Sequence, residues 1–389
     1  MTNSISFQAT EVTSDSECRA QIQSVYQRLE DGAQPSMFQS WGWMSCWLES
    51  VLDKKSVTFV VAFDSGHPVA AAFFCQGRRY RKRLPMNTAL FINSTGVEAI
   101  DGPHGMEYNG LLGATLSPDI LKGMLDTVEP LWKELVCIGM DAKKFSPAFS
   151  RHDICDVDVE VEVDYELPSY FADLDKVRDS GQPYISFLSK NCRSQIRRSY
   201  RGFEEYHGKV KLHTAASASE ALHLLDQLMV LHRARFKREG RTSGFDSDFS
   251  LRFHRRLIKH QFSKGAIQLL KVEAGNQVLG YLYNYVFCGR VHFIQGGLIE
   301  SKDNKLRPGL VCHVEAIEFS LASNLTRYDF LAGDERYKAS LATGKEDFNL
   351  VSWVRLQRPR WYFSLERRGL MATKSLLGSL KRWSEALQA

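Results

Sequence analysis

Hydrophobic and polar positions recur along the second half of the chain with the periods of helices and strands. Apolar residues return every third or fourth position in the expected helices, and they alternate with polar ones or run together in the expected strands. The pattern predicts helices over 191–205, 217–239, 249–262, 308–324 and 336–341, and strands over 209–214, 266–273, 278–287, 291–299, 327–331 and 350–356. This half therefore mixes helices and strands, with three consecutive strands at its centre.

The first half carries a looser version of the same order. Its pattern predicts strands over 4–12, 57–63, 69–74, 134–140 and 156–165, and helices over 18–29, 40–51 and 118–129. Similar element order, without visible sequence identity, indicates two related α/β domains. The polar segment 169–183, with Gly181 and Pro183, separates them. We therefore expect one domain over 1–180 and a second over 181–389.

Composition is that of a globular chain. The 389 residues are 44% hydrophobic and 24% charged, which excludes long disorder and fibrous repeats. No apolar run reaches the ~18 residues of a membrane-spanning helix, and no basic segment with an apolar core opens the chain. We expect a cytoplasmic protein without an integral membrane segment. Its eight cysteines match no metal-binding spacing, which predicts reduced thiols and no metal.

Positive charge is concentrated in the second half. The net charge of +5 is too small for a protein that coats DNA, so no DNA partner is expected. Basic runs occupy 190–201, 233–241 and 355–389. They are either solvated helix faces or the binding surface of an anionic ligand, such as a phosphate-bearing cofactor. The last run also allows peripheral contact of the tail with a membrane.

A helix start at Pro308 follows the strand over 291–299 and a polar loop. The free N–H groups and the dipole of a helix N-terminus favour a phosphate, and Gly309 permits close approach of a ligand. Lys305 and Arg307 add positive charge. We predict a cofactor site at Lys305, Arg307, Gly309 and Leu310; the alternative is an ordinary loop before a helix that starts with proline.

The segment 328–338 is the most specific motif of the chain. It reads Tyr-Asp-Phe-Leu-Ala-Gly-Asp-Glu-Arg-Tyr-Lys and resembles a signature of the divergent GNAT acyltransferases of the CelD-like, cellulose-biosynthesis type. The loop 307–310 and the segment 231–236 also resemble that family. The likeness covers about 185–345, and the upstream half suits the degraded GNAT-like domain of a tandem, Fem-like arrangement.

The resemblance implies a fold and a reaction. The fold is two tandem GNAT-like α/β domains, each a mixed, mostly antiparallel sheet flanked by helices. The reaction is N- or O-acylation, with acetyl as the expected group, by direct attack of an acceptor on the thioester of acyl-CoA between two splayed parallel strands. Acetyl-CoA is then a cosubstrate, and no cofactor is bound permanently. The acceptor is a small molecule or a glycan precursor for the cell envelope or an exopolysaccharide.

The resemblance and the spacing together indicate candidate site residues. Tyr337 is the expected acid, although it equally fits an amphipathic helix residue. Asp329 is either a base or acceptor anchor, or a helix cap, and Asp334 is a third catalytic candidate. His232 and Arg235 share a helix face and are placed with Lys338 in the acceptor pocket. Asp334 and Lys338 also have the i,i+4 spacing of a structural ion pair.

Two other functions remain open. One is a Fem-type transferase that uses aminoacyl-tRNA, although no heptad repeat predicts the coiled-coil arm that would favour it. The other is a non-catalytic GNAT-like protein that binds a polysaccharide or a partner. The incomplete likeness of the loop 306–310 to a standard GNAT phosphate loop is the main support for the second.

Overall fold

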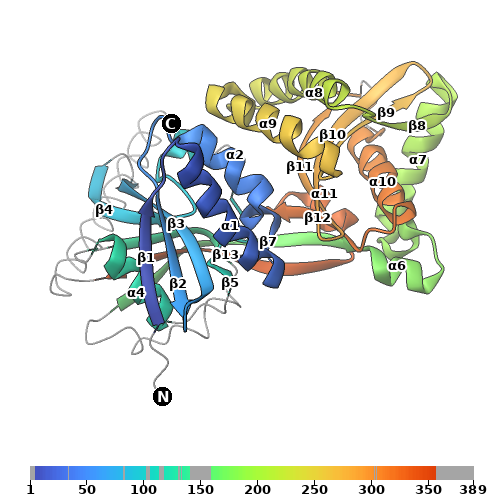
Figure 1. Ribbon diagram of the computed structural model, residues 1–389. Coiled ribbons are helices and arrows are strands. Elements are labelled where there is room, and N and C mark those ends of the chain that lie inside the picture. The colour runs from blue at the N-terminus through green and yellow to red at the C-terminus, as the bar shows by residue number, and fades with distance from the viewer. Residues whose placement is uncertain are drawn as a thin grey trace, which may run out of the picture.

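A computed structural model gives the architecture of the chain (Figure 1). It describes residues 5–355 apart from 34, 82–83, 102–105, 114–117, 130–131, 133, 141–158, 302 and 304. The basic tail predicted over 355–389 therefore lies, beyond its first residue, outside the described part.

One continuous path of strands runs through both halves in the order β1-β2-β3-β4-β6-β13-β7-β12-β11-β10-β9-β8, with β5 beside β3. The strands are β1 (Ile5–Glu11), β2 (Thr58–Asp64), β3 (His67–Arg81), β4 (Leu84–Ile92), β5 (Leu112–Gly113), β6 (Glu134–Met140), β7 (Val159–Asp173), β8 (Val210–Thr214), β9 (Ile267–Ala274), β10 (Gln277–Phe287), β11 (Arg290–Leu298), β12 (Arg327–Ala332) and β13 (Gly344–Arg355). Among the strands of the described residues, only β4–β6 and β11–β12 pair in parallel. Each half is thus a mixed, mostly antiparallel set of strands, as predicted.

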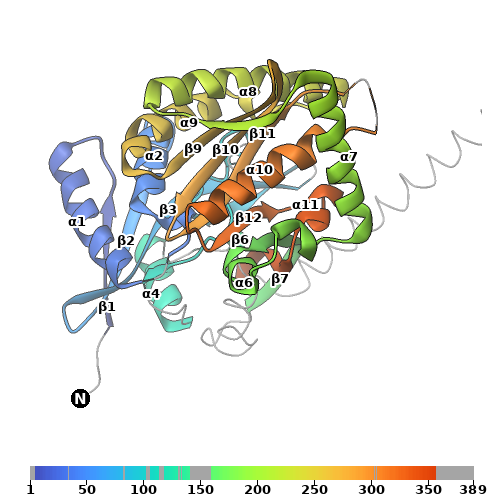
Figure 2. The same ribbon diagram turned by 90° about the vertical axis from the view of Figure 1, so that its right-hand side faces the viewer.

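Helices cover both faces of these strands. They are α1 (Ser16–Gly32), α2 (Trp41–Val51), α3 (Glu98–Asp101), α4 (Pro118–Val128), α6 (Leu174–Ser180), α7 (Lys190–His207), α8 (Ala218–Arg238), α9 (Asp248–Gln261), α10 (Pro308–Ala322) and α11 (Arg336–Leu341). Short 3-10 turns lie at Met37–Gln39, Tyr184–Phe187, Gly244–Asp246 and Phe262–Lys264. In Figures 1 and 2, α8 and α9 lie on one face of the second half, while α7 and α10 lie on the other.

A single hydrophobic core joins the two halves on the face covered by α1, α2, α8 and α9. Trp43 of α2 packs edge-on against Phe253 of α9, with 4.8 Å between ring centroids. A Cβ at Gly42 would lie 2.7 Å from the end of the Gln261 side chain, so a larger residue here would force that side chain to move. On the opposite face, α4 covers the first half and α6, α7 and α10 cover the second.

The two halves also exchange strands. β7 follows the first half in sequence but pairs with β12, whereas β13 at the end of the described chain pairs with β6. β7 and β13 pair with each other along their full lengths. The polar segment 169–183, predicted as a linker, comprises the end of β7, helix α6 and the turn that follows it. The boundary after residue 180 stays a prediction.

The elements of the second half match the prediction closely. The helix predicted over 217–239 begins at a cap: the Ser217 hydroxyl accepts the Glu220 N–H, and the Glu220 carboxylate accepts the N–H of Ala216. In the first half, β4 was missed. None of the described helices is long and apolar enough to span a membrane. The described cysteines are all free thiols.

Candidate active site

A gap opens between the parallel strands β11 and β12. Their ladder begins at Arg290 and Arg327 and ends at the pair His292 and Asp329. Beyond that pair, β11 stays with β10 while β12 stays with β7. The described residues show no hydrogen bond between β11 and β12 past this point. The gap is the wedge between splayed strands that the sequence predicted here.

Asp329 organises the carboxyl end of β12. Its buried carboxylate accepts the N–H of Leu331 at 2.8 Å and the hydroxyl of Tyr108 at 3.1 Å. Arg327 lies 3.3 Å away, and Ser169 also donates to this carboxylate. The bond to Leu331 holds that residue at a φ of 61°, which is unusual for a branched side chain. Asp329 therefore shapes the strand end, and its alternative as a helix cap is wrong.

Lys338 supports the same turn from the other side. Its ammonium group donates to the carbonyl of Ala332 at 2.6 Å and lies 3.2 Å from the Glu335 carboxylate. The ion pair expected between Lys338 and Asp334 is thus made with Glu335, one residue later, because α11 begins only at Arg336. Asp334 is exposed in the turn. The roles predicted for Asp334 in catalysis and for Lys338 in acceptor binding remain predictions.

Tyr337 lies on the α10 side of the gap. Its ring stacks on His313 of α10 with 5.3 Å between centroids and an angle of 18°. Burial raises the pKa of Tyr337, so the hydroxyl keeps its proton at neutral pH. A protonated hydroxyl can serve as a proton donor. Burial lowers the pKa of His313 to about 3, which makes His313 a neutral core residue.

His232 lies on the α8 side. Its Nδ1 is 2.9 Å from the Ser243 hydroxyl and its Nε2 is 3.0 Å from Oε1 of Gln295. Burial lowers its pKa to about 4, so the ring is neutral and fixes the Gln295 side chain on β11 beyond the last ladder pair. Arg235 pairs with Glu239 at the half-exposed end of α8. Its charge also acts on Tyr337, which places these two predicted residues in one neighbourhood.

The start of α10 has the features of a phosphate site. The side chain of Arg307 is exposed, and its backbone N–H donates to the Ser199 hydroxyl at 2.9 Å. Helix α10 begins at Pro308, so the N–H groups of Gly309 and Leu310 lack partners within the helix. Lys305 is exposed beside them, and Arg198 donates to its carbonyl at 3.2 Å. The structure thus brings the four predicted cofactor residues together at one helix end.

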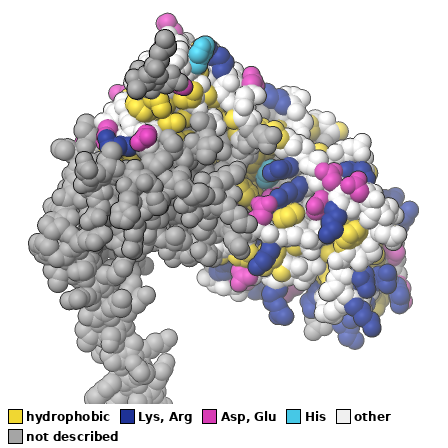
Figure 3. All heavy atoms as spheres, turned by 90° about the horizontal axis from the view of Figure 1, so that it is seen from below, with side chains coloured by type: hydrophobic (Ala, Val, Ile, Leu, Met, Phe, Trp, Pro, Cys, Tyr) yellow, Lys and Arg dark blue, Asp and Glu magenta, His cyan; other side chains and the backbone are white. Residues whose placement is uncertain are grey.

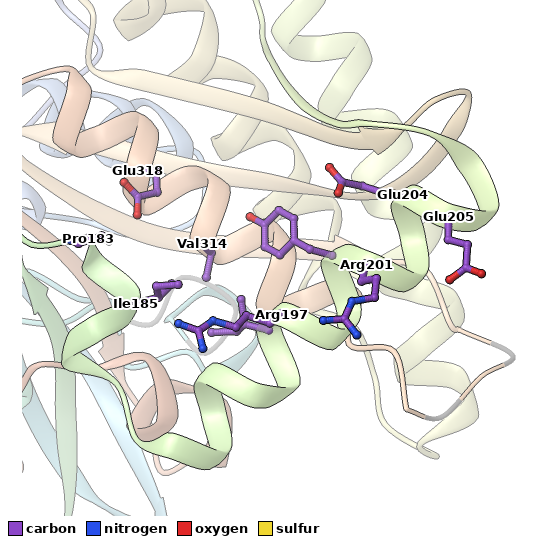
Figure 4. A pocket seen from close by; sticks show the side chains of 10 residues that line it. Pro183, Ile185, Arg197, Arg201, Glu204, Glu205, Val314 and Glu318 are labelled. Carbon is purple, nitrogen blue, oxygen red and sulfur yellow. The ribbon is translucent and has the colours of Figure 1, made fainter.

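A separate open groove of about 900 Å³ runs along α7 and α10 (Figure 4). It is lined by Pro183, Ile185, Ile196, Arg197, Tyr200, Arg201, Glu204, Glu205, Val314 and Glu318. None of the predicted site residues lines it. Two arginines of the basic helix 190–201 lie here beside three glutamates. Figure 3 shows basic and acidic side chains likewise interspersed on the visible part of the second half.

Residues from the first half also reach the gap, and the sequence did not reveal them. The Glu107 carboxylate accepts the N–H of Ala332 at 2.6 Å. Tyr108 contacts Ser169 of β7 as well as Asp329. Both residues belong to a glycine-rich stretch whose pattern predicts no element. Their approach to β12 depends on a contact across more than 200 residues of sequence, for which the chain carries no local signal.

Comparison with known proteins gives a family match within the second half. Residues 190–339 match the family model described as the acetyltransferase (GNAT) domain. This stretch is therefore similar to a GNAT acetyltransferase domain. It contains β11, α10, β12 and Tyr337, and therefore the gap and the helix start described above. No curated protein matches the sequence.

Solved structures share the arrangement of both halves. FemX is 10% identical over 88% of this chain and 97% of its own, with a TM-score of 0.54. A protein of unknown function from Bacteroides thetaiotaomicron is 10% identical over 90% of this chain and 100% of its own, with a TM-score of 0.53. L-PGS from Bacillus licheniformis is 11% identical over 90% and 95%, at 0.51. At these identities the likeness concerns the fold.

Proposed function

We propose that the protein transfers an acyl group, with acetyl as the first candidate, from acyl-CoA to an amine or hydroxyl of an acceptor. The observation that carries this proposal is the gap between β11 and β12 within the GNAT domain. On its α10 side lie Tyr337 and, at the start of α10, the exposed Arg307. On its α8 side lie the Asp329 carboxylate and His232.

The geometry supports a division of roles. The N–H groups of Gly309 and Leu310, with Arg307 and Lys305, hold the pyrophosphate of acyl-CoA. The thioester then enters the gap, where a free backbone N–H of β11 polarises its carbonyl. The acceptor nucleophile attacks that carbonyl carbon and the bond to sulfur breaks. Tyr337 gives its proton to the leaving thiolate.

We further propose that the chain is of the CelD-like type, with a small molecule or a precursor of the cell envelope or an exopolysaccharide as its acceptor. The motif 328–338 supports this, because the residues it shares with that type form the turn around Lys338 and Glu335. His232, Arg235 and Lys338 are the proposed contacts to the acceptor.

Binding experiments test the proposal. Acetyl-CoA, longer acyl-CoAs and charged tRNA are each added to the purified protein and its melting temperature is recorded. A ligand that binds only the folded state must raise that temperature. We expect acetyl-CoA to raise it and charged tRNA to leave it unchanged. The reverse result would favour the Fem-type reaction, and binding without acyl transfer to any acceptor would favour a binding protein.

A further inference from the structure

The first half contains its own pair of splayed parallel strands, β4 and β6. Their ladder consists of Leu90 with Leu135 and Phe91 with Val136, after which β4 ends at Ile92 while β6 continues to Met140. This is the counterpart of the gap between β11 and β12. In the first half, however, the space beyond the ladder is filled by the chain itself.

The segment Met106–Gly110 fills that space. The Asn109 backbone N–H donates to the carbonyl of Gly139 on β6, and its side-chain amide donates to the carbonyl of Ile92 on β4 at 3.0 Å. Asn93 donates in turn to Oδ1 of Asn109 at 2.9 Å. A side chain at Gly139 would lie 2.1 Å from the Met106 carbonyl oxygen, so the segment packs directly against the backbone of β6.

The same segment projects toward the second half. Tyr108 has a φ of 51°, in the left-handed region that non-glycine residues rarely adopt, so a strained backbone is maintained here by its surroundings. Next to it, Glu107 meets the N–H of Ala332 at 2.6 Å. The segment that fills the gap of the first half therefore places the Glu107 carboxylate at β12, beside the gap of the second half.

We infer that Glu107 is the general base of the reaction in the second half. The segment Met106–Gly110 occupies the place that a cofactor cleft would take in the first half, and it positions this base instead. The inference deepens the proposed acyl transfer and rests on it. The acceptor's N–H or O–H proton passes to the Glu107 carboxylate while the new bond to the acyl carbon forms. The carbon–sulfur bond breaks, Tyr337 protonates the thiolate, and exchange with solvent restores both groups.

Three observations support this role. Asp329 and Leu331 belong to the α8 face of β12, whereas Tyr328, Phe330 and Tyr337 belong to the α10 face. The hydroxyl of Tyr108, the neighbour of Glu107, bonds to Asp329 on the first face, whereas the proposed acid Tyr337 packs on the second. Asp329 already contacts Leu331, Tyr108 and Arg327, whereas within the described part of the chain the Glu107 carboxylate accepts one hydrogen bond, from Ala332, and has a second oxygen.

The charges around Glu107 fit a base. Burial raises the pKa of Glu107 to about 8, against the lowering effect of its bond to Ala332. Lys338 of α11 lowers that pKa, while Asp329 of β12 and Glu335 raise it. Tyr108, on the same segment, is protonated because burial raises its own pKa. A base is most effective when its pKa is near the working pH.

The variant Glu107→Gln tests the inference, because an amide can still accept the N–H of Ala332. Thiol release from acetyl-CoA is measured across about pH 5.5 to 9.5, with water as the acceptor. We expect the rate to fall at least about 100-fold and the rise in rate with pH to disappear. The affinity for CoA, measured by calorimetry, should stay close to that of the parent protein, and the melting temperature should not fall below that of the parent.

Glu30→Gln is the matched control. Glu30 is also a half-buried carboxylate of the first half, and it accepts the Trp41 N–H at 3.0 Å, far in sequence from the gap. It should retain the parent rate and pH profile. A Glu107→Gln protein with the parent rate and profile would overturn the inference and leave the proposed function intact. A parent protein that neither binds nor hydrolyses acetyl-CoA would instead overturn the proposed function.

Discussion

Each half of this protein has a gap where a short parallel ladder ends, and the two gaps differ in what lies inside them. Between β4 and β6, Asn109 bridges the diverging strands with its backbone and its side chain. Between β11 and β12, the described residues provide no such bridge, and Asp329, Gln295 and Ala332 surround the gap instead. The difference teaches that splayed strands alone do not make a site. The gap must stay open, and groups with useful protons must face it.

The largest expected effect concerns the acid at the open gap. Tyr337→Phe keeps the ring that stacks on His313 but removes the proton donor. We expect turnover of acyl-CoA to fall by about 10²–10⁴-fold with nearly unchanged CoA affinity. The control Tyr200→Phe removes the hydroxyl bonded to Glu315 beside the groove and should retain turnover. Full activity of Tyr337→Phe would exclude Tyr337 as the acid.

A smaller effect is expected at the helix start that only the open gap possesses. Arg307→Glu reverses the charge at the first turn of α10. A charge-assisted contact contributes about 1.5–3 kcal/mol, so CoA affinity should fall at least about tenfold. Calorimetry measures this, with Lys211→Glu on the exposed edge strand β8 as the control. Equal CoA affinity in both variants would remove this helix start from the site.

The filled gap can be weakened by Asn109→Ala. The change removes three hydrogen bonds of the Asn109 side chain, which accepts from Asn93 and the Gly110 N–H and donates to the Ile92 carbonyl, so the free energy of unfolding should fall by about 1–3 kcal/mol. Denaturant unfolding measures the loss. Asn276→Ala, in the exposed turn between β9 and β10, should change stability little. If the segment positions Glu107, Asn109→Ala should also slow acyl transfer; unchanged stability would show that Asn109 does not secure the gap.

The last prediction concerns how the free energy of unfolding changes with pH. The folded-state pKa of Glu107 is raised to about 8, so the folded protein holds its proton more tightly than the unfolded chain does. This group therefore makes stability fall as pH rises between about 4.5 and 8, by at most about 1.4 kcal/mol per pH unit. Glu107→Gln should remove that fall.

Comparing the parent protein with the Glu107→Gln variant separates the pH effect of Glu107 on stability from the effects of other titratable groups. Burial lowers the pKa of His232, His254 and His292 to about 4, so these residues make stability rise with pH from about 4 to 6.5 in both proteins. Unfolding at several pH values should show the Gln variant gaining on the parent as pH increases. A constant difference would contradict the raised pKa of Glu107.

Local patterns determined most of the second half. The helix start at Pro308, the cap at Ser217 and the three strands before α10 all lie where periodicity and capping residues predict them. These features depend on neighbours a few residues away, so the sequence states them directly. The motif 328–338 likewise located the end of β12 and the turn to α11, because its residues form hydrogen bonds with one another. Asp329 accepts the N–H of Leu331, and Lys338 donates to the carbonyl of Ala332.

Only the tertiary structure decided how the halves combine. The exchange of β7 and β13, the shared core around Trp43 and the arrival of Glu107 at Ala332 all join segments far apart in sequence. Such contacts form because each half has a hydrophobic face to bury. The hydrophobic pattern of the sequence does not say which segment will cover that face. Register and packing select one of them. Which gap is closed by Asn109 and which stays open is therefore settled in three dimensions.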